Sequence, residues 1–248
     1  MTYKAEAPSK KSDQLGFRPK RFWKTTAVVA TDNGFAIALD GRRVKTPKGT
    51  DLVLPNAVLA GLVDAEWAAV GDHLDYEHMP LTRFGFASID RMHEVVDDTI
   101  AEVLRYAETD LVCYPSEYPE ALILREKAAW LPLLDWARGD LGLAFVQNHT
   151  IIHAPQPAET IAGLRDLVLG LTPWQQAGLM AAIPLFGSVV LALAVLRGHL
   201  TGDAAYAASR IGEDFQAETW GRDEEAAQRA ASHRSLAVSL DVWFRPLA

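Results

Sequence analysis

Short apolar runs alternate with turn residues over the first quarter of the chain. Four strand-like runs cover residues 25–30, 35–39, 42–46 and 52–54. The turns between them contain Asn33-Gly34, Asp40-Gly41 and Pro47-Lys48-Gly49. Asn-Gly and Asp-Gly favour tight hairpins, because both turn positions need positive φ. The pattern predicts a β-meander over residues 22–54.

The spacing of apolar residues becomes helical after Pro55. Residues 56–70 place Trp67 on their apolar side, which predicts a helix whose Trp67 faces the core. Thr82 is a suitable N-cap for one long helix that runs to about residue 108. The buried stripe of that helix is expected to contain Ile89, Met92, Val96, Ile100, Val103 and Leu104.

The rest of the chain has mainly the pattern of helices. Residues 120–136 are helical in spacing, with Pro132 as a kink. Residues 145–153 are apolar and β-branched, and they predict one more strand. Further helices are expected over residues 158–169, 173–183, 186–197, 203–219 and 223–244.

Strands followed by helices indicate an α+β fold rather than an alternating α/β fold. We expect three segments in the chain. They are a flexible basic tail over residues 1–20, a small and mostly antiparallel β domain over 21–85, and a larger all-helical domain over 86–248.

A long uncharged run challenges the interpretation as a soluble protein. No charged residue occurs from Leu167 to Leu196, and about 18 apolar residues can span a membrane. Pro184 and Gly187 interrupt this run, because proline removes a helix hydrogen bond and clashes with the preceding turn. We therefore expect two buried helices broken at residues 184–187 and no stable membrane insertion, with a membrane-associated factor as the alternative.

The charge and cysteine content limit the class of protein. The formal net charge of −8 argues against general affinity for nucleic acid, although residues 1–25 are locally basic. This basic stretch lacks the apolar core of a secretory signal, and its acids and prolines do not suit a mitochondrial presequence. The single cysteine, Cys113, excludes an internal disulfide and favours a reducing compartment. These features suggest a protein of the bacterial cytoplasm, and we expect a monomer.

No motif for catalysis, metal or cofactor stands out. His149 and His153 are four residues apart, but on a strand that spacing is about 13 Å, and no acidic ligand lies nearby. Cys113 has no surrounding signature of a nucleophile. Phosphate-binding glycine loops and the Gly-x-Ser-x-Gly elbow are absent from the sequence. We expect no catalytic residue, cofactor or metal, although a carboxylate pair in an interdomain cleft stays open as an enzyme alternative.

An acidic segment near the end of the chain has two interpretations. Gly221 can end one helix, and Asp223 can cap the next with Glu224 and Glu225 in its first turn. Capping explains Asp223 but does not require both glutamates. Residues 203–229 also carry an excess of acidic side chains, which could attract a basic partner.

Seven motifs occur along the chain in a specific order and spacing. They are Arg21–Lys24, residues 39–47, Glu66-Trp67, Met79–Thr82, Ile89–Arg91, Thr109–Tyr114 and Trp220-Gly221 with its following acids. In this order and spacing they resemble a family of assembly chaperones that bind the alpha subunit of F-type ATP synthase. Arg21–Lys24 resembles the start of that family, residues 39–47 its hairpin, and Trp220-Gly221 with its acids the C-terminal signature.

The resemblance implies a binding protein rather than an enzyme. A member of this family holds the new alpha subunit, shields its subunit interface and releases it as the catalytic head assembles. The acidic position linked to the family's function falls on Glu224 or Glu225. The expected partner-binding residues are Glu224, Glu225, Asp223 and Glu218, and the expected structural residues are Trp67, Pro80, Trp220 and Gly221.

Overall fold

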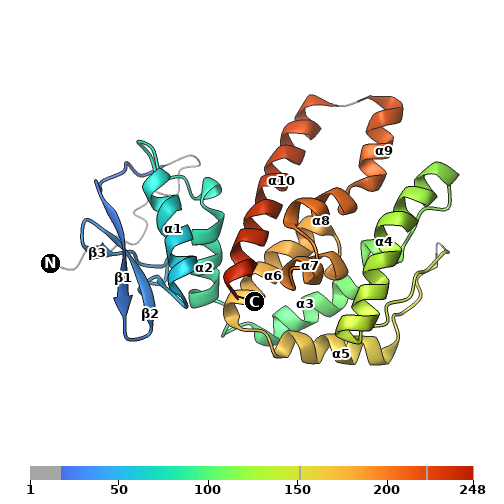
Figure 1. Cartoon of the computed structure of the whole chain (residues 1–248), viewed down its shortest axis with the longest axis horizontal. Helices are drawn as coiled ribbons and strands as arrows, with labels where there is room; N and C mark the ends of the chain where they lie inside the picture. Colours follow the sequence, from blue (N-terminus) through green and yellow to red (C-terminus); the bar gives the residue numbers. More distant parts are fainter. Residues whose placement is uncertain (1–17, 151, 222, 248) are drawn as a thin grey trace. The chain divides into compact units, whose positions relative to one another are not determined.

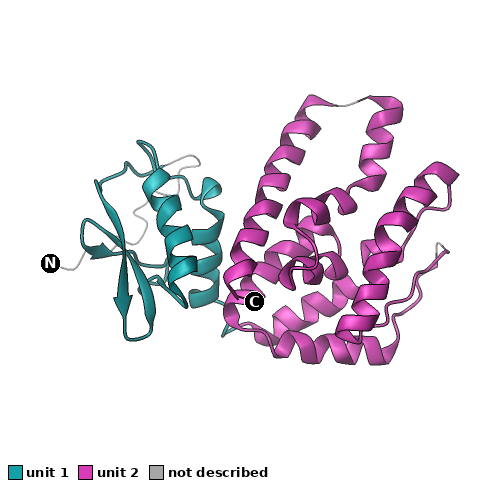
Figure 2. Ribbon diagram, viewed as in Figure 1, with its two compact units in different colours: residues 1–94 teal, residues 95–248 magenta. Residues whose placement is uncertain are grey.

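The computed structural model describes residues 18–150, 152–221 and 223–247 (Figure 1). The basic tail expected over residues 1–20 lies outside this part of the chain, apart from residues 18–20. The chain forms two compact units, residues 1–94 and 95–248 (Figure 2). The first unit contains the sheet and the second is helical, which confirms the predicted α+β class.

The first unit is built on a small antiparallel sheet with one central strand. Its strands are β1 (Thr26–Thr31), β2 (Gly34–Leu39), β3 (Arg42–Arg43) and β4 (Val53–Leu54). A two-residue turn joins β1 to β2, as the Asn-Gly signal predicts. β3 and β4 both pair with β2, so the sheet is not a simple meander. β2 is therefore central, and β1 lies at an edge.

Helix α1 (Ala57–Ala69) packs on the sheet and carries the predicted core tryptophan. The side chain of Asn56 caps the helix by accepting from the Leu59 amide. Trp67 is only 3% exposed. Its ring centroid lies 5.3 Å from that of Trp23 and 6.3 Å from that of Tyr76. Trp67 is thus enclosed by aromatic rings.

The single long helix predicted from Thr82 is wrong, because two helices form instead. They are α2 (Pro80–Asp90), which follows the short turn η1 (Tyr76–His78), and α3 (Val96–Glu108). Thr82 lies inside α2, and the carboxylate of Glu66 caps this helix by accepting from two of its amides. Asp90 accepts hydrogen bonds from Thr46 and Lys48, which holds the end of α2 on the β3–β4 loop.

The second unit surrounds one fully buried helix. This helix is α7 (Val189–Leu196), in which every residue is buried. Helices α3, α4 (Glu120–Leu141) and α6 (Pro173–Phe186) pack against it, as do the later helices α8 (Gly202–Ser209) and α10 (Glu224–Phe244). The short helix η2 (Leu111–Cys113) lies at its start, and α5 (Ala158–Leu169) packs against α3. The predicted helix break is displaced: Pro184 lies inside α6, and the turn occurs at Gly187, whose φ is 62°. Among the described residues, no helix is long and apolar enough to cross a membrane.

The strand predicted over residues 145–153 is wrong. The described part of this segment has no strand or helix assignment. Its backbone groups bond to scattered partners instead: the Asn148 amide donates to the Cys113 carbonyl, and the Val146 amide donates to the Gln156 side chain. β-Branched residues form a strand only where a neighbouring strand supplies a ladder, and the helices of this unit offer none.

The helix predicted over residues 203–219 is divided into α8 (Gly202–Ser209) and α9 (Ile211–Trp220). The indole of Trp130 donates to the Ala208 carbonyl at 2.9 Å. A continuous helix would use that carbonyl for its own hydrogen bond, so this contact favours the break.

The last helix, α10 (Glu224–Phe244), is followed by the turn η3 (Arg245–Leu247). Its second half is anchored by Ala237, Leu240, Trp243 and Phe244, all of which are buried. A Cβ on Gly202 would lie 1.8 Å from the Ala237 carbonyl oxygen. The backbones of α8 and α10 are therefore in direct contact at this point.

Candidate functional site

Helix α9 and the first half of α10 form a projecting hairpin. We define the α9–α10 hairpin as residues 211–221 and 223–235. None of these residues is buried. Figure 1 shows the two helices extending away from the packed helices of their unit. Helices of globular proteins gain most of their stability by burying an apolar face, so this bare hairpin is available to a partner.

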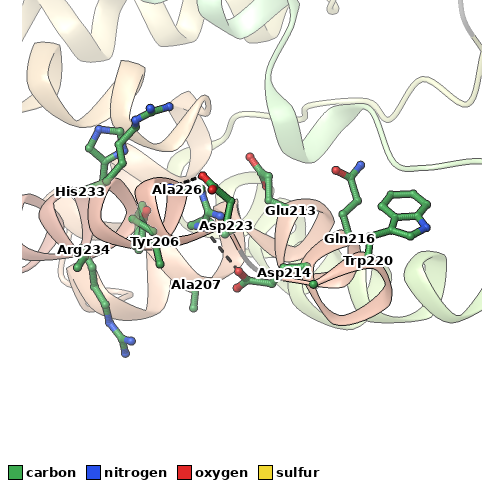
Figure 3. A pocket seen from close by; sticks show the side chains of 17 residues that line it. Tyr206, Ala207, Glu213, Asp214, Gln216, Trp220, Asp223, Ala226, His233 and Arg234 are labelled. Atoms are coloured by element: carbon green, nitrogen blue, oxygen red, sulfur yellow. Dashed lines mark hydrogen bonds and ion pairs between the residues drawn. The ribbon is translucent and has the colours of Figure 1, made fainter.

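An open groove of about 750 Å³ lies between the two helices of the hairpin. Tyr206 and Ala207 of α8 line one end of it. Helix α9 lines it with Glu213, Asp214, Gln216 and Trp220, whose side chains are drawn in Figure 3. Helix α10 lines it with Arg229, His233 and Arg234 and with four alanines, which we call the alanine wall, namely Ala226, Ala227, Ala230 and Ala231. The groove thus has polar side chains on both helices and the alanine wall on α10.

The charges around the groove are partly paired within the unit. Arg210 lies 3.7 Å from Asp214, and an Arg234 nitrogen donates to an Asp203 oxygen at 2.8 Å. Glu213 has no ion pair among the described residues. These pairs are exposed to solvent, where each contributes about 0–1 kcal/mol. The groove is therefore polar, and its weak ion pairs do not hold its charged side chains rigidly in place.

The structure places the four predicted partner-binding residues in three different environments. Asp223 lines the groove and caps α10, because its carboxylate accepts from the Ala226 amide at 2.9 Å. Glu224 and Glu225 are exposed in the first turn of α10 but do not line the groove. Glu218 pairs with Arg125 of α4 at 2.8 Å. The four acids do not form one cluster.

Glu224 is the acid of this group that is left available. Glu225 bonds to Arg229 at 2.9 Å, one helical turn along α10. Glu224 makes no ion pair or side-chain hydrogen bond to any residue that the structure describes. An exposed carboxylate that is not already paired can form a new pair with a partner's cation without first breaking one.

The residues predicted to be structural also differ in their surroundings. Gly221 ends α9 with a φ of 95°, a conformation that favours glycine. Trp220 is 79% exposed and lines the groove, so it does not belong to the core. Pro80 occupies the first turn of α2, where the missing amide hydrogen has no cost. Trp67 is buried in the aromatic cluster of the first unit.

A second kind of acidic residue is buried and joins distant parts of the chain. Asp110 is fully buried, and its carboxylate accepts from the amides of Val189, Val190 and Val112 at 2.6, 3.1 and 3.1 Å. The burial raises the pKa of Asp110 to about 6, although hydrogen bonds from Ser188 and these amides lower it. Asp110 therefore caps α7 and η2 together and has a structural role.

The other candidate residues for chemistry show no arrangement for catalysis. Cys113 is buried, and burial together with the nearby Asp110 raises the pKa of its thiol, so the thiol is unreactive. His153 lies 3.9 Å from Glu108, and Glu108 already accepts from the Gln156 amide. Within the described ranges, no group of three potential metal ligands is close enough to hold an ion.

The alanine wall of the groove was not recognised from the sequence. Its four alanines recur at spacings of one and four residues, which places them on one side of α10. Alanine is the commonest filler of exposed helices, so this spacing is a weak signal of a binding surface. The opposite wall on α9 could not be located without knowing how the two helices turn.

Three comparisons with known proteins point to one family. A family model described as ATP12 chaperone protein matches residues 20–138. The mitochondrial protein atp12 of Schizosaccharomyces pombe is 28% identical over an alignment of 219 residues that covers 84% of this chain and 75% of the relative.

Solved structures agree over most of the chain. The crystal structure of Atp12 from Paracoccus denitrificans is 37% identical, with a TM-score of 0.85, and the match covers 91% of this chain and 97% of that one. A putative chaperone from Agrobacterium tumefaciens is 36% identical with the same TM-score, and 85% of it is covered.

Proposed function

This chain belongs to the ATP12 chaperone family, a family of ATP synthase assembly chaperones, and from that premise we propose that it binds the unassembled alpha subunit of F-type ATP synthase. It holds that subunit without catalysis, shields the surface that later contacts a neighbouring subunit, and releases it during assembly of the catalytic head. Apolar subunit interfaces that are exposed before assembly promote aggregation, so covering them has a clear physical benefit.

The observation that carries the proposal is the α9–α10 hairpin, which buries none of its described residues although it is helical. Its contact with the rest of the unit is limited to exposed groups such as the Arg125–Glu218 pair with α4, so most of its surface is suited to a partner from another chain. The exposed acids at the start of α10 supply attraction for a basic patch on the alpha subunit. Glu224 is the first candidate, followed by Glu225, while Asp223 and Glu218 are already engaged.

Reversing the charges at Glu224 and Glu225 is expected to weaken capture of the alpha subunit. The variant Glu224→Lys/Glu225→Lys should lower the affinity by roughly tenfold or more, because attraction to a basic patch becomes repulsion. Its melting temperature should fall by only a few degrees, since two exposed first-turn acids contribute about 1 kcal/mol each at most. The measurement is a pull-down of purified alpha subunit without nucleotide, with the beta subunit as the specificity control.

Helix α3 offers a matched control for this variant. Asp97 and Asp98 are also two consecutive exposed acids in the first turn of a helix. The variant Asp97→Lys/Asp98→Lys therefore loses the same interaction with the helix dipole at a different surface. Equal loss of capture in both variants would contradict a specific role for Glu224 and Glu225. Failure of the wild-type chain to capture the alpha subunit would reject the proposed function and return attention to the enzyme and membrane alternatives.

A further inference from the structure

The outer edge of β1 is an unprotected sheet edge. β1 pairs with β2 along all six of its residues, from Thr26↔Leu39 to Thr31↔Gly34, without a bulge. Thr31 and Gly34 flank the two-residue turn and form a hydrogen-bonded pair, so hydrogen-bonded and non-hydrogen-bonded pairs alternate from there. The Asp40 amide donates to the Thr25 carbonyl, which agrees with this alternation.

Three residues of β1 consequently direct their backbone groups outward. They are Thr26, Val28 and Ala30, which form the non-hydrogen-bonded pairs with β2. None of their six outward N–H and C=O groups bonds to another described residue. Sheets usually protect such an edge with a charge, a proline or a bulge, and the strand sequence Thr-Ala-Val-Val-Ala-Thr contains none of these.

The side chains of β1 are also apolar and accessible. Val28 is 36% exposed and Val29 is 40% exposed, on opposite faces of the strand. A partner strand that pairs with β1 would therefore form backbone hydrogen bonds and apolar side-chain contacts together. This is the chemistry of pairing by strand addition.

We propose that β1 of one molecule pairs antiparallel with β1 of a second copy, about a two-fold axis at Val28. A two-fold axis relates two identical antiparallel strands only where a residue faces its own counterpart. Centred on Val28, the pairing sets Thr26 opposite Ala30 of the second copy, and Ala30 opposite its Thr26. All six outward groups on each strand edge then find partners.

The charges at the ends of β1 fit the same register. Lys24 lies two residues before β1 and Asp32 one residue after it, so this register brings Lys24 of one copy to the same end of the paired strands as Asp32 of the other, twice by symmetry. Neither side chain has an ion pair within the described part of its own chain. The pairing thus brings opposite charges together at both ends, which a register shifted by two residues would not do. This complementarity favours a second copy over an unrelated strand.

The interface is small, so the dimer is expected to be weak and dependent on concentration. Six-residue strands bury much less than the roughly 1,200 Å² of a typical stable interface. Sedimentation equilibrium of the full chain should therefore show a reversible monomer–dimer equilibrium, in contrast to the monomer expected from the sequence. The amides of Thr26, Val28 and Ala30 should become protected from hydrogen exchange as the concentration rises.

The variant Val28→Pro should abolish the dimer without loss of the sheet. The amide of Val28 points away from β2, so proline removes no hydrogen bond from the β1–β2 ladder. The matched control is Leu169→Lys, which changes an apolar side chain of similar exposure in the other unit and should dimerise like the wild type. Circular dichroism of Val28→Pro checks that the fold is kept.

A mixing experiment tests the register without relying on proline. Lys24→Glu and Asp32→Lys each place like charges opposite one another, so each variant alone should dimerise roughly tenfold more weakly. An equimolar mixture restores both opposite-charge pairs in a heterodimer and should recover the association. Recovery on mixing is not expected if either substitution merely damages the fold.

Three results would overturn the inference. The first is a wild-type chain that stays monomeric up to about 1 mM. The second is a dimer that persists in Val28→Pro with its fold intact or does not respond to the charge variants. The third is that the edge amides become protected from hydrogen exchange only when the alpha subunit is added, because that subunit would then occupy the edge of β1. The first two results do not bear on capture of the alpha subunit, so the proposed function is tested separately, whereas the third would itself require that the alpha subunit is bound.

Discussion

Replacing Asp110 by alanine should lower the free energy of unfolding of the helical unit by roughly 3–5 kcal/mol. Asp110 is fully buried and is the acceptor for the amides of Val112, Val189 and Val190. The alanine side chain leaves these donors buried without partners and opens a cavity beside α7. Urea unfolding followed by circular dichroism measures the loss.

Asp110→Asn is the matched control for this variant. Asparagine has nearly the same shape and keeps one oxygen acceptor, so it should cost less than alanine. A loss of under about 1 kcal/mol in Asp110→Ala would show that water or a rearranged backbone satisfies the amides of α7.

Because the pKa of Asp110 is raised, the contribution of this residue to the free energy of unfolding should depend on pH. Its pKa is about 6 in the folded chain and close to 3.8 when the chain is unfolded. Between about pH 4 and pH 6 the folded state therefore binds more protons than the unfolded state, and the contribution of Asp110 to stability falls as the pH rises. The wild type should lose stability relative to Asp110→Asn across this window. A constant difference between the two proteins would show that the pKa of Asp110 is not raised.

Replacing Trp67 by arginine should unfold or severely destabilise the first unit, with an expected loss of about 4 kcal/mol or more. Trp67 is 3% exposed and lies between the rings of Trp23 and Tyr76. Arginine removes both aromatic contacts and places a charge in this buried cluster. Urea unfolding followed by circular dichroism measures the loss.

Trp67→Phe separates the loss of shape from the burial of charge. The indole nitrogen of Trp67 is buried without a hydrogen-bond partner among the described residues, so phenylalanine breaks no hydrogen bond. This variant should lose only about 1–2 kcal/mol, which is the cost of a partly filled cavity. A Trp67→Arg protein that unfolds at the wild-type urea concentration would contradict the structural role of Trp67.

The sequence was sufficient to predict features that depend on neighbouring residues. The hairpin at Asn33-Gly34 and the helices α1, α5 and α10 follow from turn chemistry, capping and apolar spacing. The errors arose where a distant side chain decides the local structure. Trp130 takes a carbonyl at the α8–α9 break, and Glu66 caps α2 from another helix. Residues 145–153 have strand propensity but no strand to pair with.

The motifs behind the family resemblance prove to be linked through carboxylates. Glu66 bonds to the start of α2, Asp90 bonds to Thr46 in the hairpin motif, and Asp110 bonds to the start of α7. These contacts explain why such motifs identify the fold so well. Trp220-Gly221 with its following acids differs from these motifs, because it lies on the exposed α9–α10 hairpin, whereas the alanines of α10 have little individual signature.

The bare α9–α10 hairpin has a consequence for the effect of heat on this protein. Because none of its described residues is buried, its order depends on helix propensity and on exposed contacts, such as the pair of Arg229 with Glu225 and that of Arg125 in α4 with Glu218. Such helices lose structure gradually on warming, whereas a packed core melts in one cooperative step. We therefore expect the proposed binding surface to be the first part of the described chain to fray, so that capture of a partner declines at temperatures where the packed helices are still intact.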